Sequence, residues 1–171
     1  MKTSILLLAL AVLAGCGPQV RTVTLKESLN KAQAERLMRP GKNTIKVNAF
    51  LRQSGGGVVT CAGEKVALIP ATEMAQEIIR ARYGDVNGGY VNYYDANMLR
   101  FANITQDYMT AQKESVCSSD GRVTFANVAS GEFYVSTQVT WKTAQGAVQG
   151  GRLSKLVFVD GGETLDLVLS D

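Results

Sequence analysis

The sequence of 171 residues contains no histidine, and it has only three cysteines, three prolines and one tryptophan. Histidine is the most frequent general base near neutral pH and the most frequent ligand of transition metals. Without it, a serine or cysteine nucleophile would have no imidazole partner, and no Gly-x-Ser-x-Gly motif occurs. The composition therefore argues against an enzyme, and we expect neither a cofactor nor a metal site.

The charge of the chain is small overall and unevenly distributed. The formal net charge is +3, which is too low to indicate a nucleic-acid-binding protein. The first 52 residues, however, contain nine Lys and Arg but only two Glu. The basic excess therefore lies beside the N-terminus.

The first 15 residues have the features of a secretory signal peptide. Lys2 places a positive charge at the start, and a compact apolar run from Ile5 to Leu13 follows. A helix that crosses a bilayer needs about 20 apolar residues, so this run is too short to remain as a membrane span. We expect residues 1–15 to be a cleaved signal peptide.

The end of this run, Leu-Ala-Gly-Cys at residues 13–16, resembles the lipobox of bacterial lipoproteins. The resemblance implies that Cys16 is the first mature residue and carries acyl chains that attach the protein to a membrane. The next residue is Gly17 and not aspartate, which by the sorting rule known for enterobacterial lipoproteins implies the outer membrane. The alternatives are an ordinary secreted protein, with a cysteine at this position by chance, or a buried hydrophobic helix.

Lipid attachment at Cys16 would leave two cysteines, Cys61 and Cys117. In an oxidising compartment such a pair is expected to form a disulfide. The closed loop would contribute roughly 4 kcal/mol of stability in the chain-entropy model. Two free buried thiols or a redox pair are the alternatives, but the Cys-x-x-Cys spacing of redox pairs is absent.

Residues 16–43 are predicted to be a basic tether. Apolar residues recur between Val23 and Met38 at a loose helical spacing, with Lys and Arg between them, and Pro40-Gly41 ends the segment. A short amphipathic helix, lying near an anionic surface or against the domain, is one interpretation. Because the apolar stripe is thin, we favour the other one, a solvated linker.

Several later segments alternate between apolar and polar residues, which is typical of half-buried β-strands. The longest alternation runs from Phe133 to Trp141 and predicts a central strand, with the odd-numbered side chains facing inward. Shorter segments with strand character are found at residues 45–52, 58–71, 153–159 and 165–169.

The stretch from Cys117 to Val135 contains two turn signals, Asp120-Gly121 and Ser130-Gly131, each followed by an alternating apolar run. This pattern resembles the carboxypeptidase-regulatory-like, or transthyretin-like, family, over roughly residues 44–69 and 116–170. The resemblance implies a mainly β protein, with a transthyretin-like (prealbumin-like) β-sandwich over residues 44–171. The catalytic domain that accompanies this module in zinc carboxypeptidases is absent here, and so are the histidines of the transthyretin-like enzymes that act on hydroxyisourate.

A helical and tyrosine-rich insertion is predicted at about residues 72–115, between strands of the sandwich. Thr72 can cap a helix that continues to about Arg82 and stops near Gly84. Five of the six tyrosines then lie between Tyr83 and Tyr108.

We interpret Tyr90, Tyr93 and Tyr94 as candidate binding residues, since exposed tyrosines stack on sugars and form rigid contact areas for proteins. The alternative is that the tyrosines of the insertion form a satellite core under a long loop. The sequence thus predicts a non-enzymatic envelope lipoprotein, anchored in the outer membrane through Cys16, that presents its sandwich to a protein partner. A carbohydrate-binding lipoprotein is the alternative.

Overall fold

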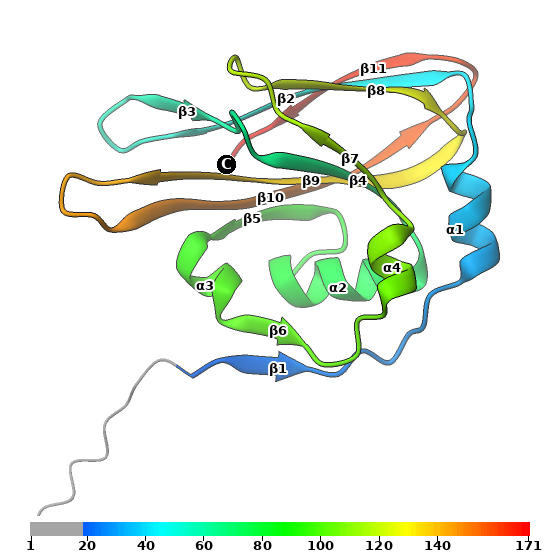
Figure 1. Cartoon of the computed structure of the whole chain (residues 1–171), viewed down its shortest axis with the longest axis horizontal. Coiled ribbons are helices and arrows are strands. Elements are labelled where there is room, and N and C mark those ends of the chain that lie inside the picture. The colour runs from blue at the N-terminus through cyan, green and yellow to red at the C-terminus, as the bar shows by residue number, and fades with distance from the viewer. Residues whose placement is uncertain (1–18) are drawn as a thin grey trace, which may run out of the picture.

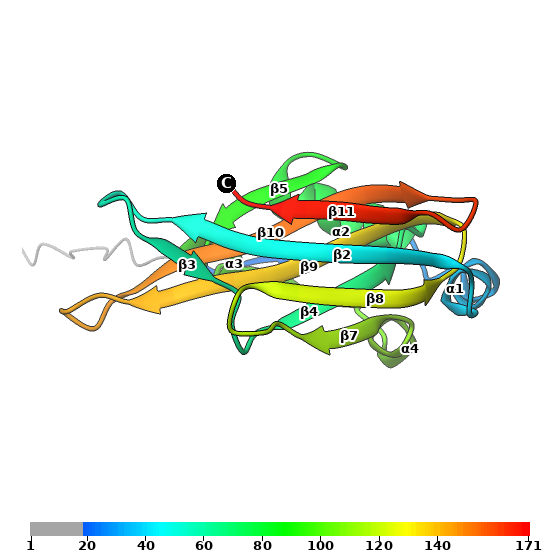
Figure 2. The ribbon, with the colours of Figure 1, turned by 90° about the horizontal axis from the view of Figure 1, so that it is seen from above.

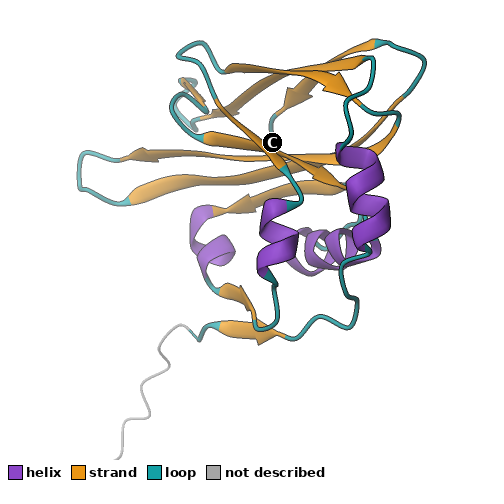
Figure 3. Cartoon of the chain, turned by 45° about the vertical axis from the view of Figure 1, so that its right-hand side comes forward, coloured by secondary structure: helices purple, strands orange, loops and turns teal. Residues whose placement is uncertain are grey.

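The structure is a computed structural model that describes residues 19–171, so the predicted signal peptide and Cys16 lie outside the described residues. Two β-sheets pack face to face, and helices cover the outer face of the larger sheet (Figure 1). The helices are grouped on this one side of the molecule (Figure 3). The predicted fold class, a mainly β sandwich with a helical, tyrosine-rich insertion, is confirmed.

The larger sheet has five strands in the order β5-β10-β9-β4-β7, all antiparallel to their neighbours. The strands are β5 (Gly88–Asn92), β10 (Val148–Val159), β9 (Gly131–Lys142), β4 (Lys65–Pro70) and β7 (Lys113–Val116). The long alternation thus forms the middle strand, β9, as predicted. Its residues Phe133, Val135 and Val139 are fully buried between the sheets.

The smaller sheet is organised around β2 (Asn43–Arg52). Strand β11 (Thr164–Leu169) pairs with it in parallel on one side, while β8 (Arg122–Val128) and β3 (Val58–Thr60) pair with it in antiparallel on the other. Figure 2 shows β2 running between β11 and β8. Alternate residues of β2, such as Ile45 and Leu51, are buried in the core between the two sheets.

Helix α2 (Glu73–Tyr83) begins and ends where the sequence predicts. The Thr72 hydroxyl accepts a hydrogen bond from the Ala75 N–H at 3.4 Å, and Gly84 ends the helix in the left-handed conformation at φ 79°. Two short helices, α3 (Tyr93–Asn97) and α4 (Gln106–Thr110), complete the insertion. The buried side of α2 packs on the larger sheet and forms a second hydrophobic core.

Tyr134 on β9 belongs to this second core. The alternation predicts an outward position for it, and it does point away from the first core, but it is 0% exposed because the helical layer covers this face. Its hydroxyl donates a hydrogen bond to the Val86 carbonyl at 2.6 Å. Burial raises the pKa of Tyr134 to about 12.

The prediction of a solvated linker is wrong for the part of residues 16–43 that the structure describes as β1 (Arg21–Val23) and α1 (Lys31–Met38). Strand β1 pairs in parallel with β6 (Leu99–Phe101), on the far side of the helical layer from the sandwich (Figure 1). Leu25 and Leu37 are each only 4% exposed. The thin apolar stripe is sufficient because each of its larger side chains enters an existing core.

Residues 21–27, which we call the N-terminal strap, are also held by polar contacts with the insertion. The Glu77 carboxylate on α2 accepts hydrogen bonds from the backbone N–H groups of Lys26 and Glu27 at 2.9–3.0 Å. These bonds lower the pKa of Glu77 because they favour its charged form. The strap is therefore part of the folded domain.

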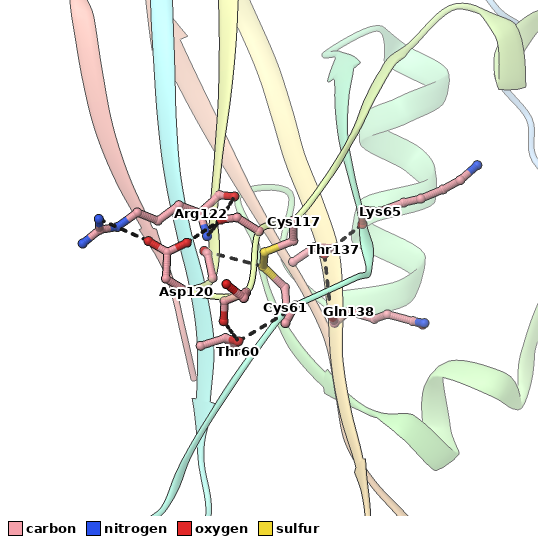
Figure 4. Close-up of a disulfide and its surroundings, with 12 residues drawn as sticks. Thr60, Cys61, Lys65, Cys117, Asp120, Arg122, Thr137 and Gln138 are labelled. Atoms are coloured by element: carbon pink, nitrogen blue, oxygen red, sulfur yellow. Dashed lines mark hydrogen bonds and ion pairs between the residues drawn. A yellow bond between two sulfur atoms is a disulfide. The ribbon is translucent and has the colours of Figure 1, made fainter.

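The predicted disulfide between Cys61 and Cys117 is present, with the two Cα atoms 5.7 Å apart (Figure 4). Cys61 lies between β3 and β4, and Cys117 lies between β7 and β8. Each of these two segments passes from one sheet to the other. The disulfide therefore links the β3–β4 connection covalently to the β7–β8 connection, and both connections pass between the two sheets.

Candidate functional site

The tyrosines of the insertion fall into two groups. Tyr108 is 7% exposed and Tyr83 is partly buried, both in the second core, and burial raises the pKa of each to about 12. Tyr90, Tyr93 and Tyr94 are instead 41%, 37% and 55% exposed. The two interpretations of the insertion, satellite core and exposed surface, thus each apply to a different part of it.

The three exposed tyrosines are neighbours on one short segment. Tyr90 is on β5, while Tyr93 and Tyr94 open helix α3. Asn92 fixes the turn between these elements: its Oδ1 accepts a hydrogen bond from the Asp95 N–H at 2.9 Å, and its Nδ2 donates to the Asp95 carboxylate at 2.6 Å. The positions of the rings are therefore set by an ordered strand-to-helix turn.

These tyrosines line one open hollow of about 410 Å³, which we call the tyrosine depression. It lies where the β2–β3 turn, the ends of β9 and β10, the β5–α3 segment and the C-terminal residue meet. Its other lining residues are Arg52, Ser54, Asn92, Trp141, Val148, Gln149, Gly150 and Asp171. Nothing in the sequence marks Trp141, Gln149, Arg52 or Asp171 as site residues, because they lie at separate strand ends and at the C-terminus, which only the fold brings together.

Two glycines inside β10 make room for aromatic rings at this site. A Cβ atom on Gly150 would lie 2.9 Å from the ring of Trp141, and one on Gly151 would lie 2.7 Å from the ring of Tyr90. The sequence suggests a turn from residue 146 to 151, but the turn spans Thr143 to Ala147 and both glycines lie within the strand. Each ring thus packs over glycine backbone, an arrangement that covers otherwise bare strand positions.

The depression offers hydrogen-bonding groups beside its aromatic rings. The Tyr90 hydroxyl donates to the Gly150 carbonyl at 3.1 Å, and the Trp141 Nε1–H donates to Gln149 Oε1 at 3.1 Å. Burial and the nearby charge of Asp171 raise the pKa of Tyr90. Arg52 adds donors and Asp171 adds acceptors, so the surface combines ring faces with polar groups of both kinds.

The described residues provide no other recognisable chemistry at this place. Across residues 19–171, no three His, Cys, Asp or Glu side chains gather in a way that could hold a metal ion. None of the helices in the same range is long and apolar enough to span a bilayer. The arrangement is suited to binding by stacking and hydrogen bonding.

Comparison with solved structures supports the fold. The chain is similar to a candidate carbohydrate-binding protein from Pseudomonas aeruginosa, with a TM-score of 0.70 and 21% sequence identity over 85% of this chain and 99% of that one. A weaker similarity, with a TM-score of 0.35 and 11% identity over 77% of this chain and 30% of the other, connects it to the major pilin subunit of Bacillus cereus.

No family model matches the chain, and no curated protein matches it. The protein is thus classified by its fold alone, as a two-sheet β-sandwich with a helical layer on one face. Membership of the transthyretin-like family stays a prediction.

Proposed function

We propose that this protein is a non-enzymatic lipoprotein of the bacterial outer membrane, attached through Cys16, that binds carbohydrate in the tyrosine depression. The observation that carries the proposal is the meeting of three exposed tyrosines and Trp141 in one hollow with amide, guanidinium and carboxylate side chains. Sugar rings present an apolar face and a rim of hydroxyl groups. Aromatic faces beside mixed donors and acceptors match both features.

Two further observations support carbohydrate as the ligand. The similar solved structure from Pseudomonas aeruginosa is described as a candidate carbohydrate-binding protein. The rings in the depression also lie on ordered backbone, with Tyr90 and Trp141 packed over Gly150 and Gly151. A site in which the rings are already positioned loses little conformational freedom when it binds a ligand.

The test is a binding titration with the folded part of the chain, residues 19–171, against oligomers of N-acetylglucosamine and purified peptidoglycan fragments. We expect Tyr93→Ala and Tyr94→Ala each to weaken binding by roughly five- to tenfold, since an aromatic contact is worth about 1 kcal/mol. Phe158→Ala is the matched control, because Phe158 is 61% exposed on β10 and does not line the depression. Absence of binding to any of these glycans, or equal binding by the tyrosine variants, would refute the proposal for this class of sugar.

A protein partner is the second candidate, and a groove between α1 and α4 favours it. This groove of about 480 Å³ has Leu29, Ala34, Met38 and Thr110 among its lining residues. Met109, which precedes Thr110 on α4, is 51% exposed beside the groove. Photo-crosslinking in intact envelopes from position 109, compared with position 94, tests this candidate. One protein captured reproducibly from position 109 would favour a protein partner.

A further inference from the structure

Two arginines line a second hollow, and a third lies beside it on a neighbouring strand. Arg21 on β1 and Arg82 on α2 line a hollow of about 210 Å³, together with Val91 on β5. Arg152 on β10 is the cross-strand partner of Val91, so the two side chains are on the same face of the sheet. We call this cluster the arginine hollow.

Arg82 is the most constrained of the three. Its guanidinium lies over the ring of Phe101, 5.4 Å from the ring centre, and its Nη1 donates to the Ala96 carbonyl at 3.3 Å. The ion pairs found among residues 19–171 are Lys31–Asp107, Lys65–Glu114 and Arg122–Asp120, so no carboxylate in this range pairs with Arg82. Burial, followed by the charge of Arg152, lowers the pKa of Arg82.

Asp95 also lines the hollow and accepts a hydrogen bond from the side chain of Asn92. Its single negative charge offsets only one of the three arginines, so an excess of positive charge remains. Arg21 donates to the Ala81 carbonyl at 3.1 Å and stays exposed. A hollow with this excess of guanidinium groups favours an anion, and guanidinium geometry suits a phosphate in particular.

The position of the hollow in the chain indicates where such a phosphate would come from. Gln19, the first residue that the structure describes, lines the arginine hollow. Cys16 precedes it by three residues, and three residues span at most roughly 11 Å. Acyl chains on Cys16 would therefore place the hollow within reach of the lipid headgroups.

We propose that the arginine hollow binds the phosphate of an anionic lipid headgroup and thereby orients the domain on the membrane. The choice of a lipid as the occupant rests on the proposed attachment at Cys16. Tyr90 and Val91 are consecutive residues of β5 and point to opposite faces, so the tyrosine depression lies on the other side of β5 from the hollow. Contact through the hollow leaves the depression open.

The experiment uses residues 19–171, which contain every described element and no acyl chain, so its result does not depend on lipid attachment at Cys16. Sedimentation with vesicles of phosphatidylcholine alone is compared with vesicles that also contain phosphatidylglycerol. We expect binding only to the anionic vesicles, weakening as salt is added. Two basic residues near a membrane surface contribute about 1 kcal/mol each, so Arg21→Gln/Arg152→Gln should weaken binding by roughly tenfold or more.

Lys46→Gln/Arg122→Gln is the matched control, because it also removes two positive charges, both from exposed positions on the smaller sheet. Arg82 is left in place since its packing on Phe101 contributes to the fold. Equal losses in the control and the Arg21→Gln/Arg152→Gln variant, or equal binding to neutral vesicles, would overturn the proposal. So would inorganic phosphate that binds in an Arg21- and Arg152-dependent way while the vesicles do not bind, because the hollow would then take a soluble anion.

Discussion

The side-chain amide of Asn103 pairs with both backbone groups of Leu25, 78 positions earlier in the chain. Asn103 Oδ1 accepts from the Leu25 N–H at 2.8 Å, and Nδ2 donates to the Leu25 carbonyl at 3.0 Å. The amide thus continues the hydrogen bonding of the β1–β6 pair beyond the end of β6. It places the Leu25 side chain in the second core.

Asn103→Ala should detach the N-terminal strap without unfolding the sandwich. It removes two hydrogen bonds and leaves partly buried backbone groups of Leu25 without a partner, which costs about 1–3 kcal/mol. Hydrogen exchange measures this directly: we expect faster exchange at residues 21–27 and unchanged exchange in β9. Unchanged protection of the strap would mean that Glu77 and β6 hold it without Asn103.

Gly151→Ala should disturb the tyrosine depression through the backbone. The added Cβ would lie 2.1 Å from the Val91 carbonyl oxygen and 2.7 Å from the Tyr90 ring, so β5 has to move away from β10. We expect a loss of stability of about 1–3 kcal/mol in denaturant titration and weaker glycan binding. Gly55→Ala is the control, because a Cβ there meets no atom within 4 Å. Equal effects of the two substitutions would contradict the packing described.

Loss of the disulfide should destabilise the whole sandwich. Cys61 and Cys117 are 56 positions apart, and closing such a loop contributes roughly 4 kcal/mol in the chain-entropy model. Cys61→Ala/Cys117→Ala should therefore lower the melting temperature by roughly 10 °C, and a reductant should lower that of the parent by a similar amount. A melting temperature that is insensitive to reductant would show that packing alone holds the β3–β4 and β7–β8 connections together.

Stability should fall at alkaline pH. The pKa of Tyr83, Tyr108 and Tyr134 is about 12 in the folded protein, whereas tyrosine in an unfolded chain titrates near 10. Since the fold favours the neutral ring, this stabilisation is complete below about pH 10 and is lost as the pH rises toward 12. Denaturant titrations across this range, with tyrosinate absorbance, measure the loss, which Tyr108→Phe should reduce. Titration of all six tyrosines near pH 10 in the folded state would be the contrary result.

Cys16→Ser should release the protein from membranes. Several acyl chains on one residue give stable attachment, and the substitution removes the thiol that would carry lipid. Fractionation of cells that express the variant should move it from the membrane pellet to the soluble fraction. The Arg21→Gln/Arg152→Gln variant, with Cys16 intact, should stay in the pellet, which separates the anchor from headgroup binding. A Cys16→Ser variant that remains in the pellet would show that attachment does not need the cysteine.

The sequence predicts the sandwich well because its signals are local. Alternation identifies β9, turn residues such as Asp120-Gly121 mark the ends of strands, and Thr72 with Gly84 delimits α2. The disulfide follows from counting cysteines, once export to an oxidising compartment is predicted. Each of these inferences needs only the residues concerned and their near neighbours.

The features that the sequence does not predict depend on long-range packing, that is, on which element covers a given face of the sheet. Tyr134 alternates as an outward residue, and only the position of α2 buries it. Leu25 and Leu37 form too thin a stripe to predict packing, because the partner surfaces are built by segments distant in sequence. The tyrosine depression also depends on long-range packing. The rings of Tyr90 and Trp141 pack over Gly151 and Gly150, which lie in strand β10 although the sequence suggests a turn there.

The parallel pairing of β1 with β6 has a mechanical consequence. A pull on the chain ahead of Gln19, directed along β1, would strain the hydrogen bonds between the two strands together, in shear, and not one after another. The disulfide-closed sandwich lies beyond the helical layer from this pair and would feel such a force last (Figure 1). The insertion, which carries the three tyrosines of the tyrosine depression, would thus be the first part of the domain to bear the tension.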